Sequence, residues 1–312
     1  MKEFQIGIDL GGTFIKGGIV SDKGELIVKE EIPTQVELGE NQIASNIAKL
    51  CEMLVQKSGV SKDNIEGVGI GSPGMIDSKN GIVVFAANLG FVNTPLAKMV
   101  QDRVNLPVKI TNDANAAALG EATYGAAKEF SDSIFITLGT GVGGGVVINN
   151  KLFEGNKSAG AEIGHMVICA NGEPCTCGLK GCFEAYSSAT ALIRDTKRAM
   201  EKDKTSKMWE VGLDGVSGKT AFAYAKVDKT AKMVVDNYIN MLALGLINLA
   251  NIFRPQAIII GGGISREPGI EKPLNEIVNA NKFAGTKGPE VKVLVASLKN
   301  DAGTFGAAAL FI

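Results

Sequence analysis

The sequence predicts an α/β fold in two domains. Apolar strands that end in glycine turns alternate with amphipathic helices along the chain, which is typical of α/β layers. A strand pattern near the start recurs after residue 133, which indicates a weak internal duplication. The 312 residues exceed what one hydrophobic core of roughly 250–300 residues usually serves. Apolar residues make up 45% of the chain, so a sizeable core can form.

Apolar periodicity places the elements. Strands are expected over residues 4–10, 14–20, 24–32, 65–74 and 108–111, as a second set within 133–153, and over 255–265 and 291–297. Helices are expected over 40–58, 93–104 and 114–122, over most of 185–253, and over 301–312. The segment Asp22–Gly24 is predicted to form a hairpin turn, and Thr94 to cap a helix before Pro95.

We place the domain boundary near residue 117. A small α/β domain would hold residues 1–117 and be completed by the C-terminal helix at 299–312, and a larger α/β domain would hold 118–298. Hinges are expected near 113–120 and 298–303, because closure excludes water from a reacting site.

Charge and composition exclude several classes of protein. The net charge is −1 and the pI near 6.0, so no surface for nucleic acid or anionic lipid is expected. The first residues enter a strand pattern without a basic and apolar leader. The longest apolar run, at 241–253, is broken by Asn and too short to span a bilayer. We expect a cytoplasmic protein with reduced thiols and no membrane partner.

Glycine is enriched, with 39 residues, and gathers at three strand ends. These turns lie at 9–13, 138–145 and 259–265, and bare backbone amides there can hold phosphate oxygens. The stretch 139–144 satisfies G-x-G-x-x-G but leads into a strand, whereas the dinucleotide fingerprint needs a helix. The simpler alternative is that the glycines only form tight hairpins.

Two further stretches raise questions of chemistry. Cys175, Cys177 and Cys182 lie within eight residues, ten residues after the only histidine, His165. They could form a disulfide, a redox pair, a metal site or core packing. Asp113 follows the strand 108–111, where it could serve as a general base or cap the next helix, and the spacing alone favours neither.

The stretches "LGTGVGGGVVINNKLFEGNKSAGAEIGHM" (138–166) and "CTCGLKGCFE" (175–184), with "TNDANAAALGE" and "IIIGGGIS", resemble the ROK family (repressors, open reading frames, kinases) of the actin–hexokinase superfamily. The resemblance runs from Gly7 to Ala309. It implies a two-domain actin/hexokinase-like (ribonuclease H-like) fold with ligands in a cleft between the domains.

The resemblance answers the cysteine question. It implies a structural zinc held by His165, Cys175, Cys177 and Cys182. Four N/S ligands suit tetrahedral zinc and leave no open catalytic position. The remaining cysteines, Cys51 and Cys169, are left outside the ligand set.

The resemblance also assigns a sugar kinase reaction that uses ATP and Mg²⁺. Asp113 becomes the general base for a sugar hydroxyl, and Asp9 holds Mg²⁺, which usually keeps much of its water. The implied sugar contacts are Gly71, Ser72, Asn88, Asn112, Asp113, Glu162, His165 and Glu184. The implied nucleotide contacts are Asp9, Gly11, Gly12, Thr13, Thr140, Gly141, Gly262 and Gly263.

The substrate is expected to be glucose, phosphorylated on its 6-hydroxyl, because "NLGF" and "EAYSSATAL" look most like the bacterial glucokinase branch. N-acetylmannosamine or another hexose or amino sugar is the alternative. Phe14 departs from the Lys or Ser often found after Gly-Gly-Thr. A sugar-responsive repressor would carry a DNA-binding module of about seventy residues before the first glycine turn, which here starts at Asp9. A non-catalytic sugar sensor is the distant alternative. A homodimer is expected, through the exposed helical faces of residues 185–253.

Overall fold

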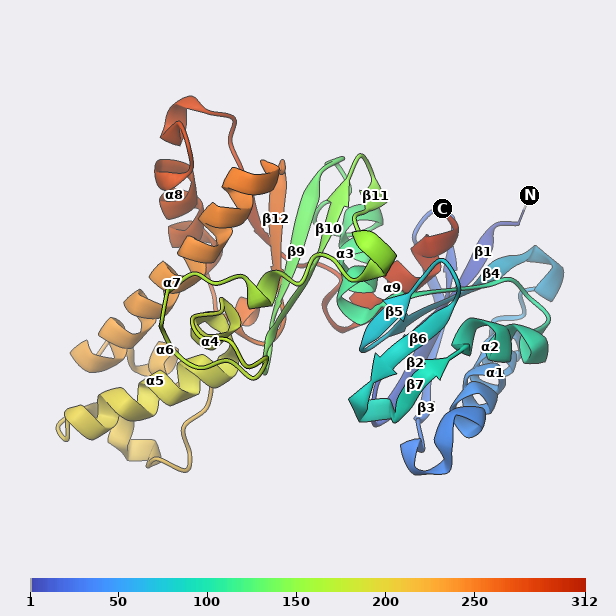
Figure 1. Ribbon diagram of the computed structural model, residues 1–312, viewed down its shortest axis with the longest axis horizontal. Coiled ribbons are helices and arrows are strands. Elements are labelled where there is room, and N and C mark those ends of the chain that lie inside the picture. The colour runs from blue at the N-terminus through green and yellow to red at the C-terminus, as the bar shows by residue number, and fades with distance from the viewer. Residues whose placement is uncertain (1) are drawn as a thin grey trace. The chain divides into compact units, whose positions relative to one another are not determined.

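The structure is a computed structural model that describes residues 2–312 (Figure 1). One five-stranded sheet has the order β3 (Leu26–Pro33), β2 (Phe14–Ser21), β1 (Phe4–Leu10), β4 (Ile65–Ser72) and β8 (Val108–Asn112). A second has the order β11 (Lys151–Leu152), β10 (Val142–Ile148), β9 (Ser133–Leu138), β12 (Ala257–Gly261) and β13 (Lys292–Val295). A small sheet contains β5 (Met75–Asp77), β6 (Ile82–Ala86) and β7 (Phe91–Thr94).

The helices account for most of the remaining regular structure. They are α1 (Gly39–Ser58), α2 (Leu96–Val104), α3 (Asp113–Thr123), α4 (Glu184–Ser187), α5 (Ala189–Lys202), α6 (Thr220–Tyr224), α7 (Lys229–Phe253), α8 (Glu271–Asn281) and α9 (Ala302–Ala308). Contacts divide the chain into two compact units. The first holds the chain up to Asp132, with Gly145–Ala161 and Ser297–Ile312, and the second holds Ser133–Gly144 and Glu162–Ala296.

The two five-stranded sheets share one strand order. In each sheet, three strands that follow one another in sequence lie side by side. The first of the three also pairs in parallel with a later strand, and that strand pairs in parallel with the last one. Thus β1, β2, β3, β4 and β8 correspond to β9, β10, β11, β12 and β13. The α/β class and the internal duplication predicted from the sequence are therefore confirmed.

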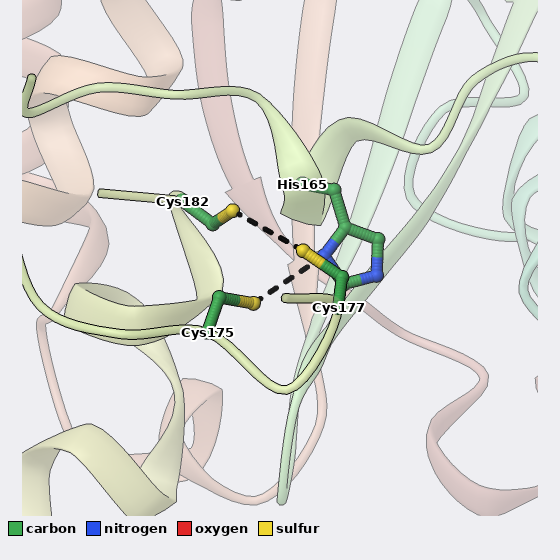
Figure 2. Close-up of side chains that lie close together, drawn as sticks. All are labelled: His165, Cys175, Cys177 and Cys182. Carbon is green, nitrogen blue, oxygen red and sulfur yellow. Dashed lines mark hydrogen bonds between the residues drawn. The ribbon is translucent and has the colours of Figure 1, made fainter. Parts of the chain in front are cut away.

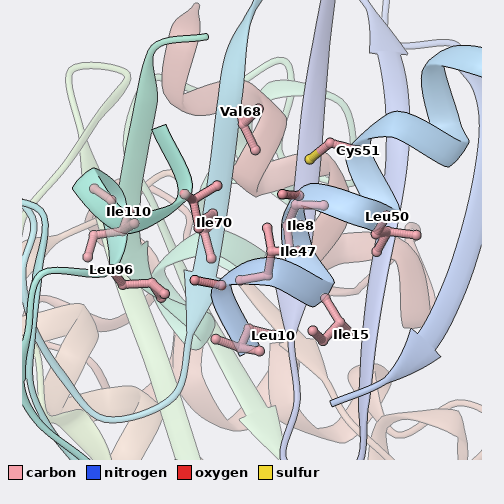
Figure 3. Packing of buried hydrophobic residues seen from close by; sticks show 14 of the residues in the cluster. Ile8, Leu10, Ile15, Ile47, Leu50, Cys51, Val68, Ile70, Leu96 and Ile110 are labelled. Atoms are coloured by element: carbon pink, nitrogen blue, oxygen red, sulfur yellow. The ribbon is translucent and has the colours of Figure 1, made fainter. Parts of the chain in front are cut away.

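The core of the first unit lies between its sheet and α1 (Figure 3). Ile43, Ile47, Leu50 and Leu54 recur at helical spacing on α1 and are fully buried. A Cβ on Gly17 of β2 would lie 3.0 Å from Leu50 and 3.1 Å from Leu54, so the helix packs directly on the strand. Each buried aliphatic side chain contributes about 1.5–3 kcal/mol of transfer free energy.

Glycine allows α9 to approach the sheet and α3 closely. A Cβ on Gly69 of β4 would lie 1.7 Å from the carbonyl oxygen of Ala307 on α9. A Cβ on Gly306 would lie 1.5 Å from the carbonyl oxygen of Ala116 on α3. The glycine enrichment that sequence analysis assigned to ligand contact therefore also serves helix packing in this unit.

In the second unit, α7 packs against α5, α6 and α8. It is the one helix of residues 2–312 that is long and apolar enough to cross a membrane, and half of its most apolar window is buried inside the protein. That burial is also what a core helix shows.

Several predicted details differ. Thr94 does not cap α2: the helix begins at Leu96, and the Thr94 hydroxyl donates to Glu40 at 2.7 Å. The small sheet β5–β7 and α8 were not predicted. The first compact unit contains residues 118–132 and 145–161 together with the N-terminal part of the chain. The sequence analysis instead placed all of 118–298 in the larger domain. Whether either division marks domains that move independently stays a prediction.

Candidate active site and metal centre

Asp113 opens α3 directly after β8. Asn112 caps this helix, because its side-chain oxygen accepts hydrogen bonds from the backbone N–H of Ala114 at 2.9 Å and of Asn115 at 3.3 Å. The Asn112 amide also donates to the carbonyl of Gly74 at 3.1 Å. The capping function weighed in the sequence analysis therefore belongs to Asn112. One oxygen of Asp113 accepts from the N–H of Ala114 at 2.8 Å.

The pKa values of the Asp113 and Asp9 carboxyls are both raised above their ordinary range. Asp113 keeps a solvent-accessible face, yet the surrounding protein desolvates the carboxylate and raises its pKa, against the lowering effect of the Ala114 N–H. Desolvation also raises the pKa of Asp9, which Lys16 on the paired strand opposes and the charge of Asp113 reinforces. Two carboxyls with raised pKa values close to strand ends are typical of a functional site.

The first glycine turn joins β1 and β2. The N–H of Gly11 donates to the carbonyl of Phe14 at 3.0 Å, and the Thr34 hydroxyl donates to the carbonyl of Gly11 at 2.6 Å. A Cβ on Gly12 would lie 3.7 Å from the side-chain nitrogen of Asn88. Thr13, Gly12 and Asn88 are exposed, so the turn is free to contact a ligand.

Gly71 and Ser72 end β4 beneath the start of α3. A Cβ on Gly71 would lie 2.9 Å from the Cβ of Ala116 and 3.7 Å from the Cα of Asp113. The Ser72 side chain is fully buried, and its hydroxyl donates to the carbonyl of Pro73 at 3.2 Å. Gly71 thus lets α3 lie against the strand, which positions Asp113. The predicted contact of these two residues with sugar stays a prediction.

The second glycine turn joins β9 and β10 and is held by Glu184. One Glu184 oxygen accepts from the N–H of Val142 at 3.0 Å, and a Cβ on Gly141 would lie 2.2 Å from that oxygen. The other Glu184 oxygen accepts from the Thr176 hydroxyl at 3.3 Å. The Thr190 hydroxyl donates to the carbonyl of Thr140 at 2.7 Å. Glu184, predicted as a sugar ligand, therefore links this turn to the cysteine-rich loop.

His165, Cys175, Cys177 and Cys182 form one cluster (Figure 2). Their candidate ligand atoms all lie within 4.8 Å of one another. Cys175 Sγ lies 3.6 Å from His165 Nδ1, and Cys177 Sγ lies 3.6 Å from Cys182 Sγ. Ligands about 2.0–2.3 Å from one ion at tetrahedral angles would be separated by about 3.5–3.8 Å. The four residues therefore fit a structural zinc.

The loop backbone explains this fit. Gly178 and Gly181 have φ angles of +90° and +84°, a region that favours glycine. A Cβ on Gly181 would lie 1.7 Å from the carbonyl oxygen of Cys169. The turn between the cysteines is closed by the N–H of Cys175, which donates to the carbonyl of Leu179 at 2.8 Å. Cys169 lies outside the cluster, and all five cysteines are free thiols.

His165 Nδ1 faces the sulfurs, and Nε2 lies on the opposite side of the ring (Figure 2). This leaves Nε2 available to donate to a ligand while Nδ1 serves the metal. His165 ends a short 3₁₀ turn at Ile163–His165, whose preceding residue, Glu162, is exposed. At the end of β12, the Ser265 hydroxyl donates to the carbonyl of Gly262 at 2.9 Å. Space around Gly263 is open within 4 Å.

The predicted site residues divide between the two units. The first unit holds Asp9, Gly11, Gly12, Thr13, Gly71, Ser72, Asn88, Asn112 and Asp113. The second holds Thr140, Gly141, Glu162, His165, Glu184, Gly262, Gly263 and the three zinc-loop cysteines.

Sequence analysis missed Glu121, at the far end of the helix that Asp113 opens. Its side chain is fully buried and accepts from the N–H groups of Ala126 and Leu298, both at 2.8 Å, and from the N–H and hydroxyl of Ser297, both at 3.2 Å. The carboxylate thus fixes α3 to the segment at which the chain re-enters the first unit. A glutamate in an alanine-rich helix gives no signal of so distant a partner.

Comparison with known proteins identifies the family. The ROK family profile matches residues 5–312. The chain belongs to the ROK family. It is 38% identical to the glucokinase of Thermotoga maritima, over 98% of this chain and 96% of that protein. It is 34% identical to the xylose repressor of Caldicellulosiruptor bescii, over 98% of this chain and 77% of the repressor.

A solved structure agrees with this assignment. The ROK glucokinase of Streptomyces griseus, in complex with glucose and AMPPNP, matches with a TM-score of 0.79 and 36% identity, covering 98% of each chain. The ROK chain therefore has the actin/hexokinase-like fold that its sequence predicted, and it resembles sugar kinases along nearly its whole length.

Proposed function

We propose that this ROK protein is an ATP-dependent hexose kinase that transfers the γ-phosphate of Mg-ATP to the 6-hydroxyl of glucose. The observation that carries the proposal is the pair of strand-end carboxylates, Asp113 and Asp9, whose pKa values are both raised by desolvation. A general base and an acidic partner for a phosphate-bound metal are what phosphoryl transfer to an alcohol requires.

Asp113 acts as the base. Its carboxylate accepts the proton of the sugar 6-hydroxyl while that hydroxyl oxygen attacks the γ-phosphorus. The bond between the γ-phosphorus and the bridging oxygen of ADP breaks, and ADP leaves with the electron pair. A raised pKa suits this role, because a more basic carboxylate accepts the proton more readily.

The glycine turns bind the phosphates. Backbone N–H groups of Gly12 and Gly141, with the hydroxyls of Thr13 and Thr140, would donate to phosphate oxygens. Bound Mg²⁺ would neutralise charge on the β- and γ-phosphates, and Asp9 would orient it through water. The turn at 259–265 would contact the nucleotide through Gly262 and Gly263.

The sugar contacts are those that the resemblance to ROK proteins implies. Asn88, the Asn112 amide and His165 Nε2 would donate to sugar oxygens. Glu162 and Glu184 would accept from sugar hydroxyls. The zinc loop orients His165 and Glu184, so bound zinc would serve as a structural cross-link without taking part in the reaction.

Glucose is the proposed substrate because the chain resembles curated glucokinases at 37–38% identity over 96% or more of its length. N-acetylmannosamine or another hexose is the alternative within the same mechanism. A sugar-responsive regulator is a second candidate, favoured by the 34% identity to a xylose repressor. We prefer the kinase because Asp113 and Asp9, the proposed base and the proposed partner of Mg²⁺, both have raised pKa values.

Two features support a proposed cytoplasmic location and a homodimer. The described cysteines form no disulfide with one another, which suits a reducing cytoplasm. Met233, Leu244 and Ile252 are exposed on α7 and lie within one side of the helix, which supports a homodimer through this face.

The test is ADP release from Mg-ATP with glucose, N-acetylmannosamine, N-acetylglucosamine and fructose. Asp113→Asn is run beside wild type, and Asp63→Asn, a change of an exposed aspartate outside the site, is the matched control. We expect rapid turnover on glucose, unchanged in Asp63→Asn and reduced by about 10²–10⁴ in Asp113→Asn, the usual contribution of a general base.

Two outcomes would change the proposal. Preference for an acetylated sugar would keep the mechanism and replace the substrate. Sugar binding without turnover, in protein that retains zinc and its thermal transition, would favour the regulator.

A further inference from the structure

A cavity of about 660 Å³ lies within the first unit, along strand β8. β8 is the last strand of its sheet, so one of its edges is not paired with another strand. The cavity is lined by residues from the loop after β5, from α2, β8 and α3, from the β10–β11 hairpin and the segment that follows it, and from the last residues of the chain. None of the residues predicted to bind sugar or nucleotide lines it.

The charged lining of the cavity is mainly basic. Its charged side chains are those of Lys79, Lys98, Lys109, Lys151 and Glu154. Lys98 pairs with Asp102 at 2.8 Å, and Lys109 donates to the carbonyl of Leu310 at 2.7 Å. The ammonium groups of Lys79 and Lys151 are exposed and form no hydrogen bond or ion pair within residues 2–312. These two lysines are therefore free to bind an anion.

Glu154 does not oppose such an anion fully, because both of its oxygens are occupied. Oε1 accepts from the Thr111 hydroxyl at 3.0 Å, and Oε2 accepts from the Ser78 hydroxyl at 2.8 Å. The Ser78 oxygen also lies 2.8 Å from that of Ser158. This chain of hydrogen bonds joins three segments around the cavity. Its two central members are close in sequence to the free lysines: Ser78 precedes Lys79, and Glu154 follows Lys151 by three residues.

The rest of the lining suits a small polar molecule with an apolar face. Asn80, Gln101 and Asn150 supply amide groups, and Ile110, Leu119 and Leu152 supply apolar surface. A volume of 660 Å³ falls within the range of about 300–1,000 Å³ that is typical of small-molecule sites. Lysine ammonium groups bind phosphate as point charges, and amides bind hydroxyls.

We propose that this cavity is a regulatory site for a phosphorylated hexose, with its phosphate between Lys79 and Lys151 and its hydroxyls on the amides. The effect on the reaction passes through β8. The Thr111 hydroxyl donates a hydrogen bond to Glu154. The next two residues are Asn112, which caps α3, and Asp113. A ligand that draws the two lysine-bearing segments together acts on Ser78 and Glu154, and through Thr111 on the backbone that positions Asp113. Only this effect on turnover rests on the proposed function.

The first experiment measures binding by calorimetry. Glucose 6-phosphate and fructose 1,6-bisphosphate are titrated into the protein in the presence of saturating glucose and AMPPNP. These two ligands compete with the esters for the catalytic site, so that the measurement reports binding elsewhere. Orthophosphate and citrate test whether a phosphate ester on a sugar is needed. We expect saturable binding of a hexose phosphate, weakened at least about tenfold by the double variant Lys79→Glu/Lys151→Glu.

The matched control is Lys49→Glu/Lys128→Glu, which makes the same change of charge at two exposed lysines outside the cavity. It should bind the ester as wild type does. The proposal is overturned if neither ester binds, if citrate binds as well as the esters, or if the cavity variant binds as tightly as the control. This comparison holds whether or not the protein phosphorylates glucose, so its failure is distinct from failure of the proposed function.

The second experiment tests the connection to Asp113. With wild-type protein, the bound ester should change kcat/KM for the sugar by at least about twofold at fixed ATP. Ser78→Ala removes one hydrogen bond to Glu154 and should keep ester binding while it reduces the effect on turnover. An unchanged response in Ser78→Ala, or an ester that binds in the cavity without any effect on turnover, would remove the regulatory role.

Discussion

The two glycine turns occupy equivalent positions in duplicated sheets, yet they are stabilised differently. The β1–β2 turn follows Asp9, a carboxylate on its own strand that accepts no hydrogen bond from the residues described. The β9–β10 turn has no acidic residue on its strands and is held instead by Glu184, whose carboxylate accepts from the N–H of Val142. One turn presents a desolvated charge, and the other uses a charge to fix its backbone.

The difference shows that two equivalent turns in duplicated sheets can use a carboxylate for different purposes. In the first turn the charge remains available for a ligand, and the turn is ordered by local hydrogen bonds such as that from Thr34 to Gly11. In the second turn, order comes from a distant segment, since Glu184 also binds Thr176 in the cysteine-rich loop. The second turn should therefore depend on the metal cluster, and the first should not.

Removing zinc is expected to have the largest effect. Zinc analysis should find one ion per chain, and either a strong chelator or Cys177→Ser should lower the unfolding midpoint by at least about 10 °C, because metal binding in such a loop is folding free energy. AMPPNP affinity should fall with it, since the β9–β10 turn loses its support.

Cys169→Ser is the control, since Cys169 lies in the same loop but outside the cluster. It should retain zinc and stability. Protein that carries no zinc as purified and is insensitive to the chelator would contradict the dependence of the second turn on the metal.

In the first unit, the Glu121 carboxylate joins distant segments as the metal cluster does in the second, but without a metal. Glu121→Ala leaves four donor groups of Ala126, Ser297 and Leu298 without their acceptor, so we expect a loss of about 2–4 kcal/mol in the free energy of unfolding. Glu129→Ala, at an exposed position a short distance along the chain, should change it by less than about 0.5 kcal/mol. Urea denaturation of both variants measures the difference, and equal stabilities would contradict the role of Glu121.

Glu184→Gln tests the second turn itself. An amide has one acceptor oxygen where the carboxylate has two, so either the Val142 N–H or the Thr176 hydroxyl loses its partner. We expect a loss of about 1 kcal/mol in stability, measured by thermal unfolding. Glu162→Gln is the control: Glu162 is exposed and its side chain forms no hydrogen bond within the described chain, so its stability should stay unchanged even if sugar affinity falls in both variants.

How far the sequence could predict these features depends on their range. The Cys/His cluster was visible in the sequence because three of its residues lie within eight positions and the fourth is the only histidine, and the resemblance to ROK proteins assigned zinc to it. The β2–β3 turn at Asp22–Gly24 was predictable for the same local reason. Glu121 was not, because Ser297 lies 176 residues further along the chain. The small sheet β5–β7 was missed because its strands are short and only partly buried.

The resemblance to ROK proteins predicted which residues bind sugar, and the structure adds the hydrogen bonds that these residues form with the rest of the protein. Asn112 was predicted as a sugar ligand, and its side-chain oxygen caps α3, so only the amide nitrogen remains for a ligand. Glu184 was predicted in the same way and is bonded to a backbone N–H and a hydroxyl. Neither partner can be predicted from motif spacing, because each contact requires segments that the fold brings together.

Asp9→Asn should have the smallest effect and the opposite sign to Glu184→Gln. The folded-state pKa of Asp9 is raised by desolvation, so its ionised form costs stability at neutral pH, and a neutral amide of the same shape should raise the free energy of unfolding by about a few tenths of a kcal/mol after solvent screening. Because the folded protein holds this proton more tightly than the unfolded chain, wild-type stability falls as pH rises from the ordinary value near 4 through the raised pKa. The advantage of Asp9→Asn should therefore be present at pH 7 and vanish at low pH, which thermal unfolding across that range measures. A variant that is less stable than wild type at pH 7 would mean that Asp9, like Glu184, holds its turn together, and the contrast between the two turns would be lost.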